Sequence, residues 1–430
     1  MNTQMIETDL HHRDSCRLCA GKNLELAFAL KKSPIADDYV SRERLSEAQK
    51  PYPLDVFLCM ECGHAQHIDF VDAAMLFRSY NFKTASSPGL LRHFQQYVKD
   101  VVALFSISPG EFVVEIGSND GSLLKIFKES GYSVLGIDPA RSIAETATAA
   151  GIETIPEFFT SHFAEEIKQA RGSASIICAN NVYAHIDNMD DVTAGVKTLL
   201  APHGVFVFEV SYLVDTIEGR VFDTIYHEHV SHHSVEPLVR FFQKHGLELV
   251  HVERITSKGG SIRCYVRHFG SGQVSPSVQE LIALEQRMGL REIKTFQDFA
   301  ADLDKVKSQL HELLKQIQND GATIAGFGAS STVTTLIYHF ELGRFLSYLI
   351  DDNPQKAGLF SPGLHLPVVH SDVLYERKPD CVVVLAWKYF EAISKRHESY
   401  LSNGGTFVLP LPELKVFGRA PGDSSAVHTE

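Results

Sequence analysis

Short apolar runs alternate with amphipathic stretches through the middle of the chain. Mostly apolar runs, each with one acidic residue, occupy positions 112–116, 134–138 and 205–210, and an amphipathic stretch begins at Leu123, soon after the first run. Apolar runs of this length predict buried strands, and strands that alternate with helices are typical of a parallel α/β sheet. The polar turns after the strands would then meet at the carboxyl edge of the sheet, where such sheets bind ligands.

A second α/β pattern follows a long helical stretch. Apolar residues recur in that stretch at alternating steps of three and four, and a polar sequence at 319–321 ends the run. The chain then enters the turn Gly326-Phe-Gly328, and the next strand ends at Asp351. Two such glycine corners predict two Rossmann-like domains in one chain. The apolar positions of the helical stretch are Phe296, Phe299, Leu303, Val306, Leu310, Leu313 and Ile317.

The length of the chain fits three domains. Its 430 residues exceed one ordinary core, and the patterns place domains at 1–78, 79–266 and 267–430. The net charge of −13 argues against a nucleic-acid partner, because such binding draws on clustered Lys and Arg. No apolar run approaches the ~20 residues of a membrane span, and the polar segment 1–14 lacks the apolar core of a signal peptide. We therefore expect a cytoplasmic monomer without a membrane partner.

Four of the seven cysteines form two Cys-x-x-Cys pairs near the N-terminus. Cys16 and Cys19 make the first pair, and Cys59 and Cys62 make the second. Each pair can place two sulfurs on one tetrahedral Zn²⁺. A redox role is the alternative, but no βαβ pattern precedes either pair. A site of four thiolates is closed, so the predicted zinc has a structural role and folds the 1–78 domain.

The turn after the first central strand has the character of a cofactor site. It reads Gly117-Ser-Asn119-Asp-Gly121, and its glycines allow a ligand to approach the backbone closely. The glycines stand four apart and do not form the Gly-x-Gly-x-x-Gly pattern of dinucleotide sites. Glu115 precedes the turn, and Asp138 ends the next strand, where a carboxylate suits ribose hydroxyls. These carboxylates would repel a pyrophosphate, which favours a cationic cofactor without phosphate, such as S-adenosylmethionine.

Two further loops follow strands that would end beside the same cofactor. Phe158 and Phe159 follow the third strand and are expected to sandwich an adenine. A fourth strand runs directly into a polar loop that contains Asn180, Asn181 and His185. For these three residues, turn and capping chemistry is the alternative interpretation.

The segment 222–234 concentrates groups that carry protons near neutral pH. It follows the apolar strand at 205–210 and contains four histidines, a glutamate and a tyrosine. An imidazole has a reference pKa of about 6.5 and is the commonest general acid and base. A metal site or a structural cluster is the alternative. The residues are Tyr226, His227, Glu228, His229, His232 and His233.

In their order along the chain, these motifs resemble those of the sugar C-methyltransferases that act on nucleotide-linked 4-keto-6-deoxy sugars. The resemblance rests on the two Cys-x-x-Cys pairs, on Glu-Ile-Gly-Ser-Asn-Asp-Gly from Glu115, on Asn-Val-Tyr-Ala-His-Ile-Asp from Asn181, and on Tyr-His-Glu-His from Tyr226. It covers essentially the whole chain. It implies a zinc-binding N-terminal domain, a central class I S-adenosylmethionine methyltransferase domain, and a C-terminal Rossmann-like domain that contributes to nucleotide-sugar binding.

The resemblance also implies roles for individual residues. His229 would be the catalytic base, with Glu228, Tyr226 and His185 alongside it. Tyr80 matches a family tyrosine that follows the zinc domain, although the second aromatic residue of its motif is here a phenylalanine. The expected chemistry needs such groups: a C3 hydrogen beside a C4 ketone is acidic only if the enolate is stabilised. A base within about 3 Å and a donor at the ketone oxygen would meet this need.

One departure from the family pattern leaves the nucleotide open. The second glycine turn of the family usually carries a lysine, whereas 330–334 reads Ser-Ser-Thr-Val-Thr. The expected substrate is therefore a dTDP-, GDP- or CDP-linked 4-keto-deoxysugar. An NAD-linked oxidoreductase of sugar nucleotides, using the corner at Gly326, is an alternative function. A non-catalytic zinc-dependent binding protein is another, and binding of S-adenosylmethionine or NAD would separate the three.

Overall fold

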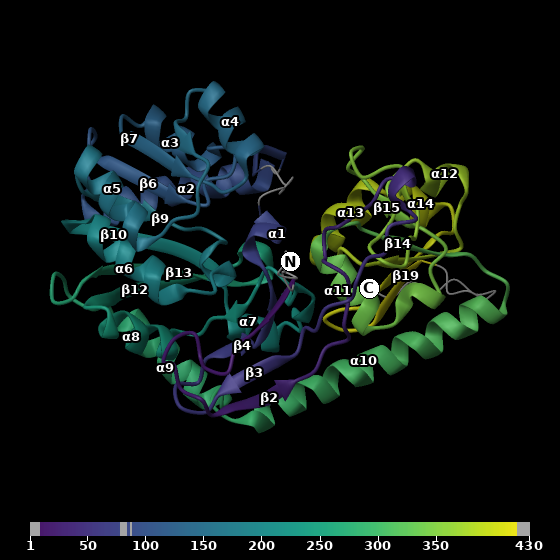
Figure 1. Cartoon of the computed structure of the whole chain (residues 1–430). Helices are drawn as coiled ribbons and strands as arrows, with labels where there is room; N and C mark the ends of the chain where they lie inside the picture. The colour runs from purple at the N-terminus through teal and green to yellow at the C-terminus, as the bar shows by residue number, and fades with distance from the viewer. Residues whose placement is uncertain (1–8, 78–83, 87, 419–430) are drawn as a thin grey trace, which may run out of the picture. The chain divides into compact units, whose positions relative to one another are not determined.

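The computed structural model describes residues 9–77, 84–86 and 88–418. The chain forms two compact units, each built from segments that are far apart in sequence (Figure 1). The predicted domain bounds near residues 78 and 266 stay a prediction. The first unit contains Met1–Glu25, Phe57–Val214 and Glu228–Arg291, and the second contains Leu26–Val56, Asp215–His227 and Glu292–Glu430.

The first unit is organised around a seven-stranded sheet. Its strand order is β12-β13-β10-β9-β6-β7-β8. The neighbours from β10 through β8 are parallel, whereas β13 runs antiparallel to both β10 and β12. This confirms the predicted α/β fold with a mainly parallel sheet. The strands are β6 (Phe112–Ile116), β7 (Ser133–Ile137), β8 (Thr154–Ile155), β9 (Ala174–Cys178), β10 (Leu200–Ser211), β12 (Leu247–Ile255) and β13 (Ser261–His268).

Helices cover both faces of this sheet. Side chains along a strand alternate between the faces, so one strand can contact helices on both sides. On β10, Val205 and Val207 belong to a buried cluster with residues of α2 and α3. Phe206 and Phe208 point the other way and pack against Phe242 of α8. The helices that lie within the first unit are α1 (Ala73–Phe77), α2 (Pro88–Phe105), α3 (Ser122–Glu129), α4 (Arg141–Ala149), α5 (Ser161–Arg171), α6 (Met189–Leu199), α8 (Val235–Lys244) and α9 (Pro276–Met288).

A four-stranded sheet, in the order β11-β4-β3-β2, frames the segment with the cysteine pairs. β3 ends at Cys59, and the turn that leads to β4 contains Cys62. Gly63 completes this turn with a φ of 84°, which strains any residue with a side chain. β4 pairs with β11, so the histidine-rich segment, residues 222–234, ends beside this turn. The strands of the N-terminal region are β1 (Leu10–His12), β2 (Leu24–Phe28), β3 (Val56–Cys59), β4 (Ala65–His67), β5 (Asp69–Val71) and, from later in the chain, β11 (Ser231–His232).

The second unit contains a six-stranded sheet in the order β16-β15-β14-β17-β18-β19. The strands from β16 to β18 are parallel, and β19 is antiparallel at the edge. This confirms the predicted second α/β domain around the glycine turn after β14. The strands are β14 (Ile324–Phe327), β15 (Leu349–Asp351), β16 (Val368–His370), β17 (Cys381–Val384), β18 (Thr406–Leu409) and β19 (Lys415–Gly418).

The long helix α10 (Ile293–Asn319) confirms the predicted helical stretch. Its buried face differs from the prediction at one position, because Leu314 is fully buried and Leu313 is not. With 3.6 residues per turn, two successive steps of four after Val306 keep the apolar stripe on one face. No helix in the described ranges is long and apolar enough to cross a bilayer. The remaining helices are α7 (Leu213–Glu218), α11 (Ser331–His339), α12 (Val373–Glu376), α13 (Phe390–Arg396) and α14 (Glu398–Ser402).

Candidate active site

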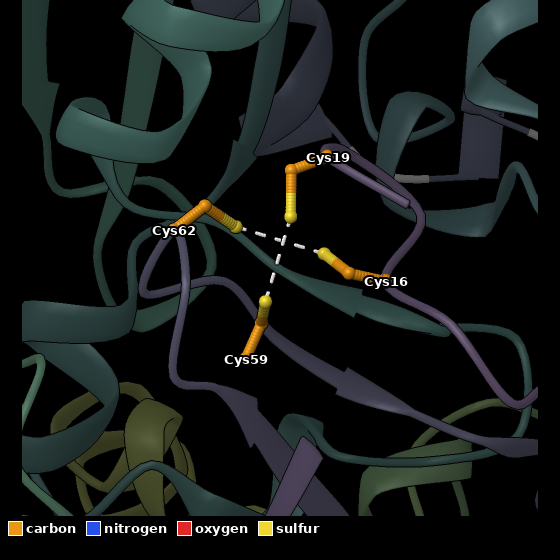
Figure 2. Close-up of side chains that lie close together, drawn as sticks. All are labelled: Cys16, Cys19, Cys59 and Cys62. Atoms are coloured by element: carbon orange, nitrogen blue, oxygen red, sulfur yellow. Dashed lines mark hydrogen bonds between the residues drawn. The ribbon is translucent and has the colours of Figure 1, made fainter. Parts of the chain in front are cut away.

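The four N-terminal cysteines converge on one point within the first unit (Figure 2). Their sulfur atoms all lie within 4.8 Å of one another. Cys16 Sγ and Cys62 Sγ are 3.6 Å apart, and Cys19 Sγ and Cys59 Sγ are 3.5 Å apart. A tetrahedral Zn²⁺ with Zn–S bonds of about 2.3 Å needs sulfurs about 3.8 Å apart. The four thiols therefore fit Zn²⁺ and would leave no coordination position for a substrate.

Arg17, within the first cysteine pair, connects this cluster to the loop after β9. Its side chain is buried, and its Nε donates a hydrogen bond to Asp187 Oδ1 at 3.0 Å. Arg13 donates to the same carboxylate, with distances of 3.0 and 3.1 Å to its two oxygens. Burial lowers the pKa of Arg17 to about 10, so the guanidinium still carries its charge at neutral pH. Because Asp187 ends the loop that contains His185, the cysteine cluster helps to hold that loop.

The turn after β6 is held by the carboxylate of Asp138. Asp138 Oδ2 accepts a hydrogen bond from the Asn119 N–H at 2.8 Å, and Oδ1 accepts one from the Ala140 N–H at 2.9 Å. The side chain of Asn119 in turn accepts from the Thr84 N–H at 2.9 Å. Gly121, with a φ of 74°, completes the turn and leads into α3. Asp138 thus lies at the predicted strand end and orders the glycine turn.

Among the described residues, some of the buried polar atoms without a hydrogen-bond partner lie at the carboxyl ends of β6 and β9. They include Glu115 Oε2, Ser118 Oγ and both amide atoms of Asn180. β6 and β9 are neighbours in the sheet. Burial, together with the charges of Asp138 and Asp120, raises the pKa of Glu115 well above its usual value. Unpartnered buried groups require a partner, and this acidic setting fits a cationic ligand with amine and hydroxyl donors, such as S-adenosylmethionine.

The other residues predicted for the cofactor lie in loops of the same sheet. Gly117 has a φ of 68°, and a Cβ there would lie 2.4 Å from a side chain of the loop after β9, so only glycine fits. Asn181 lies in that loop, and its N–H donates to a carbonyl of β10 at 2.8 Å. Phe159 is buried and contacts α6, whereas Phe158 is half-buried. The adenine contact of these two aromatic rings stays a prediction.

The rings of His185 and His229 stack on each other, with 5.0 Å between their centroids and 21° between their planes. Phe77 also stacks on His185, at 5.3 Å and 11°. Nε2 of His185 is buried and has no hydrogen-bond partner. Burial, with the nearby charges of His229 and Lys258, holds the pKa of His185 well below 6.5. The structure thus brings together two histidines from separate motifs, one of which is a neutral ring with a buried, unpartnered nitrogen.

Comparison with known proteins places the chain among enzymes of one chemistry. The chain is 33% identical over 405 residues to C-methyltransferase NovU of Streptomyces niveus. The matched region covers 94% of this chain and 96% of the relative. The chain belongs to the S-adenosylmethionine-dependent sugar C-methyltransferase family. Family models match three consecutive segments: a zinc binding domain at 16–77, a methyltransferase domain at 90–252 and a C-methyltransferase C-terminal domain at 256–412.

Two solved structures resemble part of this C-methyltransferase. The PH0226 protein of Pyrococcus horikoshii is 11% identical, covers 46% of this chain and 99% of its own, and gives a TM-score of 0.36. Magnesium protoporphyrin IX methyltransferase of Synechocystis, with bound SAH, is 15% identical and covers 44% of this chain and 89% of its own, with a TM-score of 0.32. Both likenesses are confined to less than half of the chain.

The remaining residues predicted for the C-methyltransferase reaction fall in three places. Glu228 is buried and adjoins His229 in the first unit. Tyr226 is half-buried and belongs to the second unit. Tyr80 lies outside the described residues. The first unit therefore contains His185, Glu228 and His229, and the roles of all five residues stay predictions.

A buried charged network in the same unit was not predicted from the sequence. Glu209, near the carboxyl end of β10, accepts a hydrogen bond from Arg263 Nε at 2.7 Å, and His93 Nε2 lies 2.8 Å from its other oxygen. The ring of Tyr97, which is fully buried, lies 4.7 Å from the Arg263 guanidinium. A signal was present, because Glu209 and Arg263 each interrupt an apolar strand. A buried acid in one strand requires a partner such as a buried base in the next.

A second buried acid lies in the second unit, shortly before Tyr226. Asp223 Oδ2 accepts hydrogen bonds from Trp387 Nε1 at 3.0 Å and from Lys388 Nζ at 2.6 Å, both in the loop after β17. Thr335 of α11 donates to the backbone carbonyl of Ile225 at 3.1 Å. These bonds hold the segment that leads to Tyr226 at the carboxyl edge of the second sheet.

Proposed function

We propose that this protein methylates C3 of a nucleotide-linked 4-keto-6-deoxy sugar through an enolate, in the biosynthesis of a branched deoxysugar. The stacked pair of His185 and His229 is the observation that carries the proposal. His185 lies in the loop after β9, as Asn180 does, at the carboxyl edge of the sheet. A base and a neutral donor at this edge are what enolate formation requires.

In the proposed reaction His229 takes the proton from C3, and the electron pair of the C–H bond moves toward the ketone oxygen at C4. His185 donates a hydrogen bond to that oxygen, since a neutral imidazole carries one N–H. Glu228 supports or shares the role of base. Tyr226 and Tyr80 supply further hydroxyl donors to the sugar. S-adenosylmethionine, when bound, supplies an electrophilic methyl group on a positively charged sulfur for the enolate carbon.

We assign the holding of this cofactor to the turn after β6 and the loops beside it. Glu115 and Asn180 offer buried, unpartnered atoms to its amino group. The carboxylate of Asp138 keeps lone pairs for the ribose hydroxyls in addition to its two backbone bonds. The remaining residues assigned to the cofactor are Gly117, Asn119, Gly121, Phe158, Phe159 and Asn181.

We assign the four cysteines to a structural zinc. The cluster that they form has no open position, so the metal would hold the turns of the N-terminal segment and take no part in methyl transfer. Arg17 extends this support to Asp187, after the loop of His185.

We assign the nucleotide to the turn between β14 and α11 of the second unit. Asp351 Oδ2 orders this turn by accepting from the Ala329 N–H at 2.7 Å. Ser330 and Thr332 place hydroxyls 3.1 Å from each other at the start of α11, where helix N–H groups favour phosphate. These hydroxyls would take the place of the family lysine, and the nucleotide would be dTDP, GDP or CDP. We expect the chain to act as a monomer.

An assay with defined sugar nucleotides tests the proposed function. The protein is incubated with S-adenosylmethionine and, in turn, with dTDP-, GDP- and CDP-linked 4-keto-6-deoxy sugars, and NMR locates the new methyl group. We expect methylation at C3 with one nucleotide series, and exchange of the C3 hydrogen in D₂O. Methylation of oxygen or of another carbon would contradict the proposal. So would a protein that binds S-adenosylmethionine in calorimetry but leaves all three substrates unchanged.

A further inference from the structure

Lys258 occupies a strained position in the turn between β12 and β13. Three consecutive residues have positive φ values there: 54° at Lys258, 92° at Gly259 and 121° at Gly260. The Gly260 N–H and the Ser261 hydroxyl both donate to the Ser257 carbonyl at 3.0 Å, which closes the turn. The left-handed region favours glycine, so a lysine at this position costs stability. Strain of this kind is common at functional sites.

The strand order places this turn at the carboxyl edge of the central sheet. β13 is antiparallel to β10, and Ser261 at its start is paired with Ser211 at the end of β10. The Tyr212 N–H donates to the Gly260 carbonyl at 3.4 Å. β10 is in turn parallel to β9, after which the loop of His185 begins. Lys258 therefore lies at the edge that carries the proposed reaction site.

The charge of Lys258 acts on the groups of that site. Its ammonium attracts the carboxylates of Glu209 and Glu228, and it contributes to the low pKa of His185. Arg263 is the other cation beside Glu209, and it is bound to three carboxylates, those of Glu209, Glu253 and Asp100. Lys258 is exposed as a residue, and burial of its ammonium near these groups lowers its pKa.

We propose that Lys258 is a further catalytic residue, whose ammonium faces the enolate oxygen formed at C4, an inference that rests on the proposed function. When His229 takes the C3 proton, negative charge appears on this oxygen in a site that already contains the carboxylate of Glu228. The neutral ring of His185 offers that oxygen a hydrogen bond but no charge. Lys258 supplies the positive charge, which is worth most where it is already in place before the reaction.

Substitution of Lys258 separates catalysis from stability. Lys258→Gly removes the ammonium and relieves the backbone, so the thermal midpoint should rise while kcat and C3 exchange in D₂O fall about 10²-fold. Lys258→Arg keeps the charge and should keep more activity than Lys258→Gly. The affinity for S-adenosylmethionine, measured by calorimetry, should be the same in both variants and in the parent. Lys378→Gly is the matched control, because Lys378 also has a left-handed φ, of 48°, and lies in the second unit.

The outcomes are distinct. The control should gain stability and keep full activity. If Lys258→Gly keeps the parent kcat and exchange rate, the inference is wrong, and a higher KM with unchanged kcat overturns it as well by placing the ammonium at the phosphates. The parent protein is assayed first with the same three nucleotide series. Failure of the parent to exchange or methylate C3 removes the proposed function and the role of Lys258 together, whereas an active parent with an active Lys258→Gly removes only the latter.

Discussion

Burial lowers the pKa of three histidines in the segment 222–234 and in the loop after β9. It lowers the pKa of His227 and of His233 to about 4. It is also the main reason why the pKa of His185 lies well below 6.5, with smaller contributions from His229 and Lys258. These rings are therefore neutral at pH 7. In that state each has one donor and one acceptor nitrogen, which suits hydrogen bonding to a ketone better than proton storage.

The first residue-scale prediction compares His229→Asn with Glu228→Gln. Loss of a general base typically lowers a rate about 10² to 10⁴-fold, so His229→Asn should lose that much in kcat and in C3 exchange. Glu228→Gln should lose less. His162→Asn is the control, since His162 is exposed on α5. If Glu228→Gln loses both activities while His229→Asn keeps them, the glutamate is the base; if both variants stay active, the stacked pair is structural.

The second residue-scale prediction concerns Asp138→Ala. The substitution removes an acceptor for the ribose and two bonds that order the turn, at Asn119 and Ala140. We expect calorimetry to show weaker S-adenosylmethionine binding by about 1–3 kcal/mol, the usual loss for a hydrogen bond to a charged group. The affinity of Asp138→Asn for S-adenosylmethionine should fall between that of the parent and that of Asp138→Ala. Unchanged affinity would show that the cofactor binds elsewhere, and the turn at Gly326 would be tested next.

Among the elements, the cysteine turns are where a bound metal would add to the stability that packing gives. The segment around them contains short strands, and β1, β4 and β5 each have three residues. Short strands make few backbone pairs, so the energy of metal binding would contribute directly to folding. Arg17 carries this dependence to Asp187 and hence to the loop of His185.

Removal of one zinc ligand should therefore damage folding before chemistry. We expect Cys59→Ser to contain well below one zinc per chain by metal analysis and to unfold at a lower temperature, with activity lost as a consequence. Cys381→Ser is the control, because Cys381 is a buried cysteine in β17 of the second unit. A Cys59→Ser protein with the stability of the parent would show that the cluster is not a folding site.

At the scale of the whole molecule, ion pairs join segments that are distant in sequence. Within the second unit, Glu341 lies 2.8 Å from Lys307 Nζ on α10 and 3.2 Å from Lys31 Nζ. Hydrogen bonds from Lys307 and Lys31 lower the pKa of Glu341 to about 2. A carboxylate with a lowered pKa in the folded state stabilises the protein above its unfolded pKa, and this stabilisation is lost as the pH falls through the folded pKa.

Glu341→Gln should accordingly show a pH-dependent loss of stability. At pH 7 we expect the free energy of unfolding to fall by less than about 1 kcal/mol, because an exposed ion pair is screened by solvent. The difference from the parent should shrink as the pH falls below the ordinary pKa of 4.5 toward 2. Urea unfolding at pH 7, 4.5 and 3 measures it, with Glu312→Gln on the exposed face of α10 as control. A loss that stays constant over this range would contradict the ion-pair account.

The elements and the local motifs could be predicted from residues that are close together along the chain. Cysteines three residues apart indicate a metal turn, and the apolar run before Asp138 predicted a strand that ends in a carboxylate, because a few adjacent residues set these geometries. Periodicity predicted the helix α10. Steps of three and of four residues both fit a helix, and the predicted stripe contained Leu313 where the structure buries Leu314. The predicted and observed buried faces of α10 differ at this position because Leu313 and Leu314 both fit the helical spacing.

Contacts between side chains that are distant in sequence depend on the fold. The stacking of His185 on His229, the bond from Arg17 to Asp187 and the pairing of Glu209 with Arg263 depend on which strands become neighbours. The antiparallel insertion of β13 beside β10 likewise moves the turn with Lys258 to the carboxyl edge. Strand order follows from burial across the whole sheet, whereas a local pattern specifies only which face of one strand is apolar. For that reason the residue types of each motif were readable along the chain, whereas the contacts of Arg17 and of Glu209 were not.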